Sequence, residues 1–94
     1  MAHTVTVEPD EDVQAWFVFI DHRPMIDFNR DFKGSLILQP GRHRLALDVR
    51  GSGSTFKVQI DGGAQLIVPG NGWPLTLAVP RNKSSATTVA EFTT

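Results

Sequence analysis

Cysteine is absent from this chain of 94 residues, and the absence excludes two common ways of stabilising a small domain. Without cysteine there can be no disulfide framework and no zinc site built from thiolates. The hydrophobic core must therefore supply the stability alone. Because cysteine usage is the usual sequence marker of the redox compartment, the localisation stays open.

Neither sign of charge dominates, and no apolar segment is long. Nine basic and ten acidic side chains give a formal net charge of -1, which offers no broad cationic surface to a phosphate backbone. The longest apolar run, residues 15–20, is far too short to cross a bilayer, and the N-terminus lacks the pattern of a secretion signal. The sequence therefore predicts a soluble chain with no membrane insertion and no nucleic-acid partner.

No segment shows a convincing helical period. Apolar and polar side chains instead alternate, and glycine or proline interrupts the alternation at short intervals, which is typical of an antiparallel sandwich or small barrel. We expect a single domain over residues 1–94, an all-β antiparallel β-sandwich of seven to eight strands. Residues 82–94 are expected to form either a flexible tail or an edge strand.

The clearest alternation lies in residues 45–60, where two patterned runs flank a glycine-rich turn. It predicts a hairpin in which Val49 faces Phe56, because a slip of one residue would oppose apolar to polar positions throughout. A second glycine turn, at residues 61–64, is expected to extend this hairpin into a meander. The expected core consists of Val5, Val7, Val18, Leu36, Leu38, Leu45, Leu47, Val49, Phe56, Val58, Ile60, Leu66, Val68, Leu75, Leu77 and Val79.

One strand, residues 15–20, breaks the alternation because it is apolar on both faces. A strand of this kind is normally covered on both sides. A loop, a bulge or the C-terminal tail could fold over its outer face. Alternatively, a protein partner or a second copy of the chain covers an exposed apolar patch. The second hypothesis makes Trp16, Phe17 and Phe19 the candidate partner-binding residues.

Three segments, FIDHRPM, LILQPGRHRLALDV and FKVQIDGG, together resemble the small immunoglobulin-like sandwich modules of bacteria, above all the PEGA type. The part LQPGRHRL also resembles the corner of fibronectin type III domains, with His43 near the position of their corner tyrosine. The chain departs from the PEGA pattern at Asp21-His22, where Asp-Gly would be usual, and its segment DFNRDFKG is longer than such a module needs. The resemblance implies an immunoglobulin-like, non-catalytic binding or spacer module, commonly extracytoplasmic.

Catalytic motifs are missing from the sequence. There is no G-x-S-x-G, no H-E-x-x-H and no G-x-x-x-x-G-K-[ST], and His3, His22 and His43 lie far apart. Asp21 beside His22, with Asp27 nearby, could form an acid and base pair in a cleft, but carboxylates next to histidines are common on surfaces. We therefore expect no enzymatic activity and no cofactor.

Asp27, Asn29 and Asp31 place side-chain oxygens at alternate positions, which raises the question of a calcium loop. An EF-hand loop needs glycine at its sixth position and glutamate at its twelfth, where this chain has Phe32 and Leu38. In an extended strand, side chains two residues apart are about 7 Å from one another, too far for a shared ion unless the chain curls. We expect a polar connection, with these three residues as the metal candidates.

Trp73 lies in the segment PGNGWPL, between a glycine turn and a proline. An exposed aromatic ring there could stack on a sugar with Asn71 beside it, or the ring could fold back as a lid on the core. The sequence thus predicts a protein-interaction or self-assembly module that uses residues 15–20. The alternative is a carbohydrate-binding module that uses Trp73 and Asn71.

Overall fold

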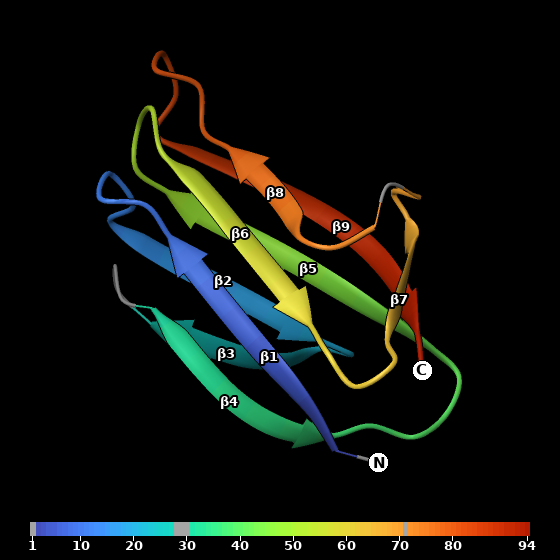
Figure 1. The fold of residues 1–94 in the computed structure, drawn as a ribbon. Helices are drawn as coiled ribbons and strands as arrows, with labels where there is room; N and C mark the ends of the chain where they lie inside the picture. Colours follow the sequence, from blue (N-terminus) through green and yellow to red (C-terminus); the bar gives the residue numbers. More distant parts are fainter. Residues whose placement is uncertain (1, 28–30, 71) are drawn as a thin grey trace.

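The computed structural model describes residues 2–27, 31–70 and 72–94, and of Met25, Ile26 and Asp27 only the backbone. These residues form two antiparallel sheets that pack face to face, with both ends of the described chain at the same end of the sandwich (Figure 1). The four-stranded sheet has the order β4 (Phe32–Ile37), β1 (Ala2–Pro9), β6 (Thr55–Ile60) and β8 (Leu75–Ala78). The five-stranded sheet has the order β3 (Arg23–Asp27), β2 (Ala15–Ile20), β5 (Arg42–Arg50), β9 (Ser85–Thr93) and β7 (Gln65–Val68).

This architecture confirms the predicted all-β sandwich, with nine strands among the described residues where seven or eight were expected. The additional strand is β3, which contains Pro24. Proline lacks the N–H that a ladder needs, so its presence opposes a strand prediction. It is tolerated in β3 because this strand lies at the edge of its sheet.

Among the described strands, β2 and β3 are the only consecutive pair that lie side by side in one sheet. Every other connection takes the chain from one sheet to the other. Immunoglobulin domains instead keep consecutive strands such as F and G adjacent, so this strand order gives no support to the immunoglobulin-like type. Strands that alternate between two sheets are typical of jelly rolls.

The predicted hairpin of residues 45–60 is wrong, because its two strands belong to different sheets. β5 pairs with β2 and β9, while β6 pairs with β1 and β8, so residues 51–54 carry the chain across the sandwich. The predicted meander after residues 61–64 is wrong too, since β7 pairs with β9. Alternation determines which face of a strand is buried, and two strands facing each other across a core alternate in the same way as two strands paired in a hairpin.

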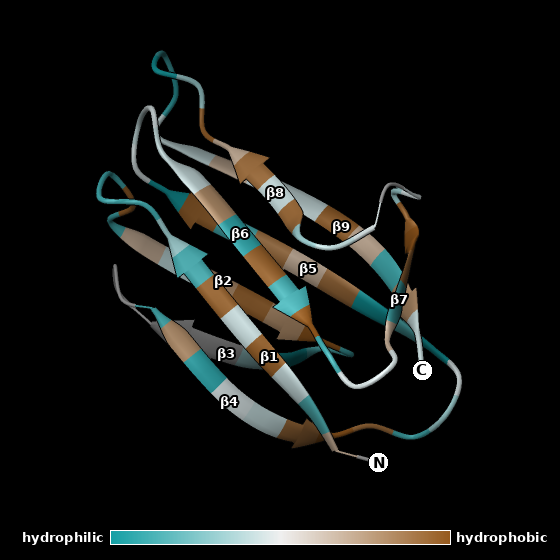
Figure 2. Cartoon of the chain, in the orientation of Figure 1, coloured by the Kyte–Doolittle hydropathy of each residue, from teal (hydrophilic) through white to brown (hydrophobic). Residues whose placement is uncertain are grey.

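The core lies between the two sheets, where apolar bands recur along the strands (Figure 2). Most predicted core residues are buried, but Leu36 and Leu77 are only half-buried and Val68 is exposed. Val68 follows an irregularity in the pairing of β7 with β9, which interrupts the alternation after Leu66. Buried residues that were not predicted are His3, Val13, Trp16, Ile20, Gly51, Ser54, Ala64, Ala90 and Phe92.

Residues 85–93 are neither a flexible tail nor an edge strand. They form β9, which pairs with β5 along its whole length and with β7 on its other side. Its inward residues Ala90 and Phe92 are buried, whereas the outward Val89 is 48% exposed. β9 is therefore an integral strand of the five-stranded sheet.

Candidate functional site

The strand β2, apolar on both faces, divides its side chains between the core and the outer face of the five-stranded sheet. Trp16, Val18 and Ile20 are buried. Phe17 and Phe19 alternate with them and are half-buried on the outer face. Trp16 is 1% exposed and packs against Phe56, with ring centroids 5.8 Å apart. The prediction that Trp16 binds a partner is therefore wrong, because it is a core residue.

An apolar row crosses the outer face of this sheet at Phe19. Phe19 lies opposite Pro24 of β3 on one side and Ala46 of β5 on the other, and Ala46 lies opposite Val89 of β9. Pro24 and Val89 at the two ends of the row are exposed. The row thus extends over four strands, and we call Pro24, Phe19, Ala46 and Val89 the outer apolar row.

Phe17 has a different environment from Phe19, although both lie on the outer face. The guanidinium of Arg50 lies 5.3 Å from the centroid of the Phe17 ring, a cation–π geometry. The same Arg50 is 3.8 Å from a carboxylate oxygen of Asp48. Part of the Phe17 ring is therefore engaged within the chain, so Phe19 is the more available of the two phenylalanines.

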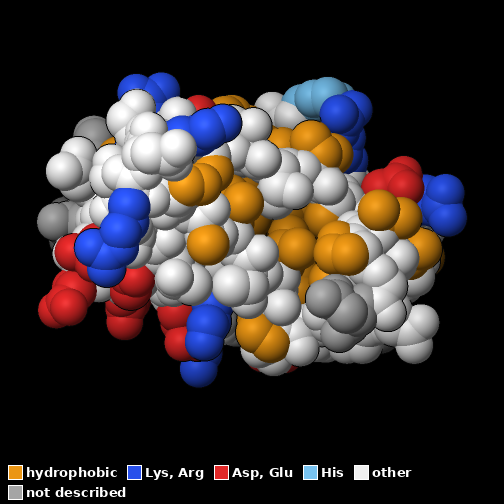
Figure 3. Space-filling model, turned by 90° about the horizontal axis from the view of Figure 1, so that it is seen from above, with side chains coloured by type: hydrophobic (Ala, Val, Ile, Leu, Met, Phe, Trp, Pro, Cys, Tyr) orange, Lys and Arg blue, Asp and Glu red, His pale blue; other side chains and the backbone are white. Residues whose placement is uncertain are grey.

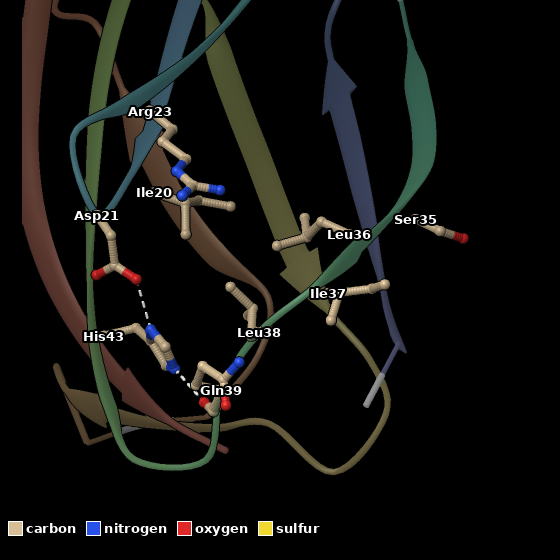
Figure 4. Close-up of a pocket in the computed structure, with 9 residues that line it drawn as sticks. All are labelled: Ile20, Asp21, Arg23, Ser35, Leu36, Ile37, Leu38, Gln39 and His43. Atoms are coloured by element: carbon tan, nitrogen blue, oxygen red, sulfur yellow. Dashed lines mark hydrogen bonds and ion pairs between the residues drawn. The ribbon is translucent and has the colours of Figure 1, made fainter.

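A cavity of about 620 Å³ opens between the edge strands β3 and β4. The side chains of Ile20, Leu36, Leu38 and Arg23 project toward it, while Ser35 points away (Figure 4). The inward residues of β4 are only half-buried, in contrast to the fully buried inward valines of β1. The two sheets are therefore incompletely closed along this side of the sandwich.

A hydrogen-bonded group of three residues lines the same cavity. His43 Nδ1 lies 2.5 Å from Asp21 Oδ2, and His43 Nε2 lies 2.7 Å from the carbonyl oxygen of Gln39 (Figure 4). The ring stacks on Phe92 with centroids 5.3 Å apart, and Thr94 Oγ1 also donates to the Gln39 carbonyl. Both ring nitrogens face acceptors, so the arrangement is satisfied when His43 is the imidazolium and donates from both.

The electrostatics of this pair follow from its bonds. Burial opposes protonation of His43, but the hydrogen bonds to Asp21 and Gln39 and the charge of Asp21 outweigh it, so the pKa of His43 is raised. Burial likewise opposes ionisation of Asp21. The N–H of Arg44 and the hydrogen bond and charge of His43 outweigh that effect, so the pKa of Asp21 is lowered. When His43 is protonated the two residues form an ion pair, and both ring nitrogens then donate to their acceptors.

Asp21 reaches His43 because of the turn between β2 and β3. Asp21 and His22 have φ values of 50° and 68°, which form the two-residue hairpin turn for which Asp-Gly is favoured. The Asp21 N–H donates to the carbonyl of Arg44, and the Arg44 N–H donates to Asp21 Oδ1. The acid and base pair suggested by the sequence, Asp21 with His22, is replaced by Asp21 with His43.

Two of the three metal candidates have side chains outside the part of the chain that the structure describes. Asn29 and the Asp27 side chain lie outside the described residues, and Asp31 is exposed. No group of three or more His, Asp or Glu side chains in the described part of the chain is arranged to hold a metal ion. The calcium hypothesis therefore gains no support.

Trp73, the candidate for carbohydrate binding, is half-buried against the core. Its indole N–H donates to the carbonyl of Ala64 at 3.0 Å, and its ring meets Phe92 edge-on at 6.0 Å. Asn71, its suggested companion, lies outside the described residues. These contacts are those of a lid on the end of the core, the other role that the sequence suggested for Trp73.

Comparison with protein-family models, curated proteins and solved structures finds no match for this chain. The resemblance to PEGA and fibronectin type III modules therefore receives no support. The bond from His43 to the carbonyl four residues upstream is nevertheless similar in kind to the bond that a tyrosine corner makes. Among the residues that the structure describes, no helix is long and apolar enough to cross a membrane.

Proposed function

We propose that the protein is a non-catalytic interaction module that associates with a second copy of itself through the outer apolar row. The observation that carries this proposal is the continuity of the row across four strands with an aromatic side chain in its middle. A sheet face with an apolar centre is suited to packing against another sheet, as in a β-sandwich. Burying a phenylalanine and its neighbours supplies the free energy of association.

The charges beside the row favour a second copy as the occupant. Arg44 lies opposite Glu91 on the neighbouring strand, and Arg50 lies close to Asp48, so both signs occur on the same face. A two-fold axis brings one patch against its own copy, and a patch with both signs can align opposite charges across that axis. The surface seen from above also shows basic and acidic side chains in similar measure (Figure 3), and a net charge of -1 gives little repulsion between copies.

Sedimentation velocity and light scattering between about one and several hundred micromolar test the proposal, because this range covers the dissociation constants of weak, reversible dimers. The wild type should show a reversible dimer, and Phe19→Lys should remain monomeric. Ile37→Lys is the matched control, since Ile37 is 76% exposed but belongs to the other sheet. A wild type that stays monomeric, or a dimer that survives Phe19→Lys, contradicts the proposal.

A further inference from the structure

We propose that the cavity between β3 and β4 is a binding site for a small amphiphilic anion, with an apolar chain inside the sandwich and a carboxylate at Arg23. This site is separate from the outer apolar row and does not depend on self-association. Its apolar wall is formed by Ile20, Leu36 and Leu38, and its cationic group is Arg23 beside them (Figure 4). The volume of about 620 Å³ falls within the usual range for small-molecule sites.

The charges around the cavity favour an anion. Both carboxylate oxygens of Asp21 already accept hydrogen bonds within the chain, from His43 and from the Arg44 N–H. Arg23 forms no hydrogen bond or ion pair with the described residues and is exposed at the mouth. A guanidinium is the side chain best suited to hold a carboxylate with two parallel hydrogen bonds. The Arg23 guanidinium therefore lies where the carboxylate of a ligand would be when its apolar chain fills the cavity.

The flanking strands argue against the obvious competitor, an added β-strand. Pro24 lies in β3, and Lys33 lies exposed in β4. Proline and lysine are the residues by which edge strands resist pairing with another chain. The cavity, by contrast, extends inward to Leu38, which is buried. A small molecule with an apolar chain can reach that depth without pairing to either edge.

Straight-chain carboxylates of six, eight and ten carbons are the probes, used below their micelle concentrations and followed by amide NMR shifts and calorimetry. Each methylene group that enters the cavity should tighten the dissociation constant about fourfold, until the chain exceeds the available depth. The largest shifts should fall in β4, the start of β3 and the start of β5. Saturable one-to-one binding with this length dependence supports the site, and its absence up to millimolar concentrations overturns it.

The contribution of Arg23 is tested by comparing octanoate with octanol on three proteins. Arg23→Gln should weaken octanoate binding about two- to fivefold and leave octanol binding unchanged, since an exposed ion pair contributes modestly. Arg81→Gln is the control. Arg81 lies near Gly53, close to the Ala15 end of β2, whereas the cavity lies at the Ile20 end. This substitution should change the binding of neither octanoate nor octanol. Equal losses for both ligands, or none for octanoate, overturn the placement of the carboxylate.

Two further results address a blocked cavity and a different occupant. Leu36→Phe should abolish octanoate binding, because Leu36 points into the cavity and the larger side chain would fill it. The variant should keep the amide spectrum of a folded protein, because Leu36 is only half-buried. If that variant folds and binds as tightly as the wild type, the ligand lies elsewhere and the proposal fails. Amide exchange protection along β4 that rises with protein concentration, without a ligand, would assign this side to a second copy and also overturn it.

Discussion

Replacing Gly51 with alanine should destabilise the fold far more than the same change at Gly41, although the two glycines have nearly the same backbone angle. Their φ values are 133° and 130°, in a region that side chains rarely adopt at a cost of about 1–3 kcal/mol. A Cβ at Gly41 would meet no atom within 4 Å, whereas a Cβ at Gly51 would lie 2.2 Å from the carbonyl oxygen of Asp12 and 3.0 Å from the nitrogen of Gln14. Both substitutions thus carry the same backbone strain, and the difference between them measures the steric overlap at Gly51.

The magnitude follows from what must move. A separation of 2.2 Å is far inside the roughly 3.5 Å at which nonbonded atoms pack, so the backbone at residues 12–14 has to shift. That segment includes the hydrogen bond from the Gln14 N–H to the Arg50 carbonyl at 2.8 Å, and the buried Val13. Overpacking that forces the backbone to shift costs about 1–3 kcal/mol. The two costs together give about 2–6 kcal/mol for Gly51→Ala, against about 1–3 kcal/mol for Gly41→Ala.

Urea unfolding followed by tryptophan fluorescence measures both free energies, because Trp16 is buried in the native state. A loss of about 2–6 kcal/mol is a large part of the stability of a domain of this size. If Gly51→Ala and Gly41→Ala lost equal stability, the close approach of residues 12–14 to Gly51 would not exist in solution.

Two predictions concern the turn and the ion pair beside it. His22→Gly should raise the free energy of unfolding by about 0.5–1 kcal/mol, since glycine accepts the φ of 68° without steric cost; an unchanged or lower melting temperature would mean that the imidazole of His22 stabilises the fold. The pKa of His43 is raised on folding, so its stabilisation is complete below its ordinary pKa of about 6.5 and is lost as the pH rises through the folded-state pKa. The urea concentration at the unfolding midpoint of the wild type should therefore decrease as the pH rises from about 6 to about 8. His43→Gln should lack this decrease, and His22→Asn should retain it. A pH dependence that persists in His43→Gln would contradict the ion pair with Asp21.

Side-chain alternation revealed the buried faces of the strands but not their partners. Val49 and Phe56 both point into the core as expected, yet they belong to different sheets. Nothing in a period of two distinguishes a turn that reverses a strand within its sheet from one that carries it across to the other. Because almost every connection crosses, the strand order could not be predicted from local patterns.

The cavity and its pair of Asp21 and His43 could not be predicted either, because they depend on which strands pair. Asp21 and His43 are brought together by the pairing of β2 with β5, in which Ile20 lies opposite Leu45. The sequence suggested the neighbour His22, but neighbouring residues direct their side chains differently. Alternation places Phe17 and Phe19 on one face of β2 and Trp16 on the other, but the sequence left open which of the two faces is the outer one. Trp16 was assigned wrongly because an apolar strand does not reveal which of its faces is covered.

The repeated crossing between sheets has a consequence for how the chain folds as it is synthesised. β1 needs β4 and β6 as neighbours, and β5 gains one of its two neighbours only when β9 is present. Apart from the hairpin of β2 and β3, no two successive strands in the described chain pair with each other, so every other pairing joins strands that are separated in the sequence. Topologies dominated by distant contacts fold slowly, since the loop entropy is lost before the contacts form. A ribosome-bound chain lacking Ser85–Thr93 would therefore hold an open edge and an unfilled core, so native structure should form late and in one cooperative step.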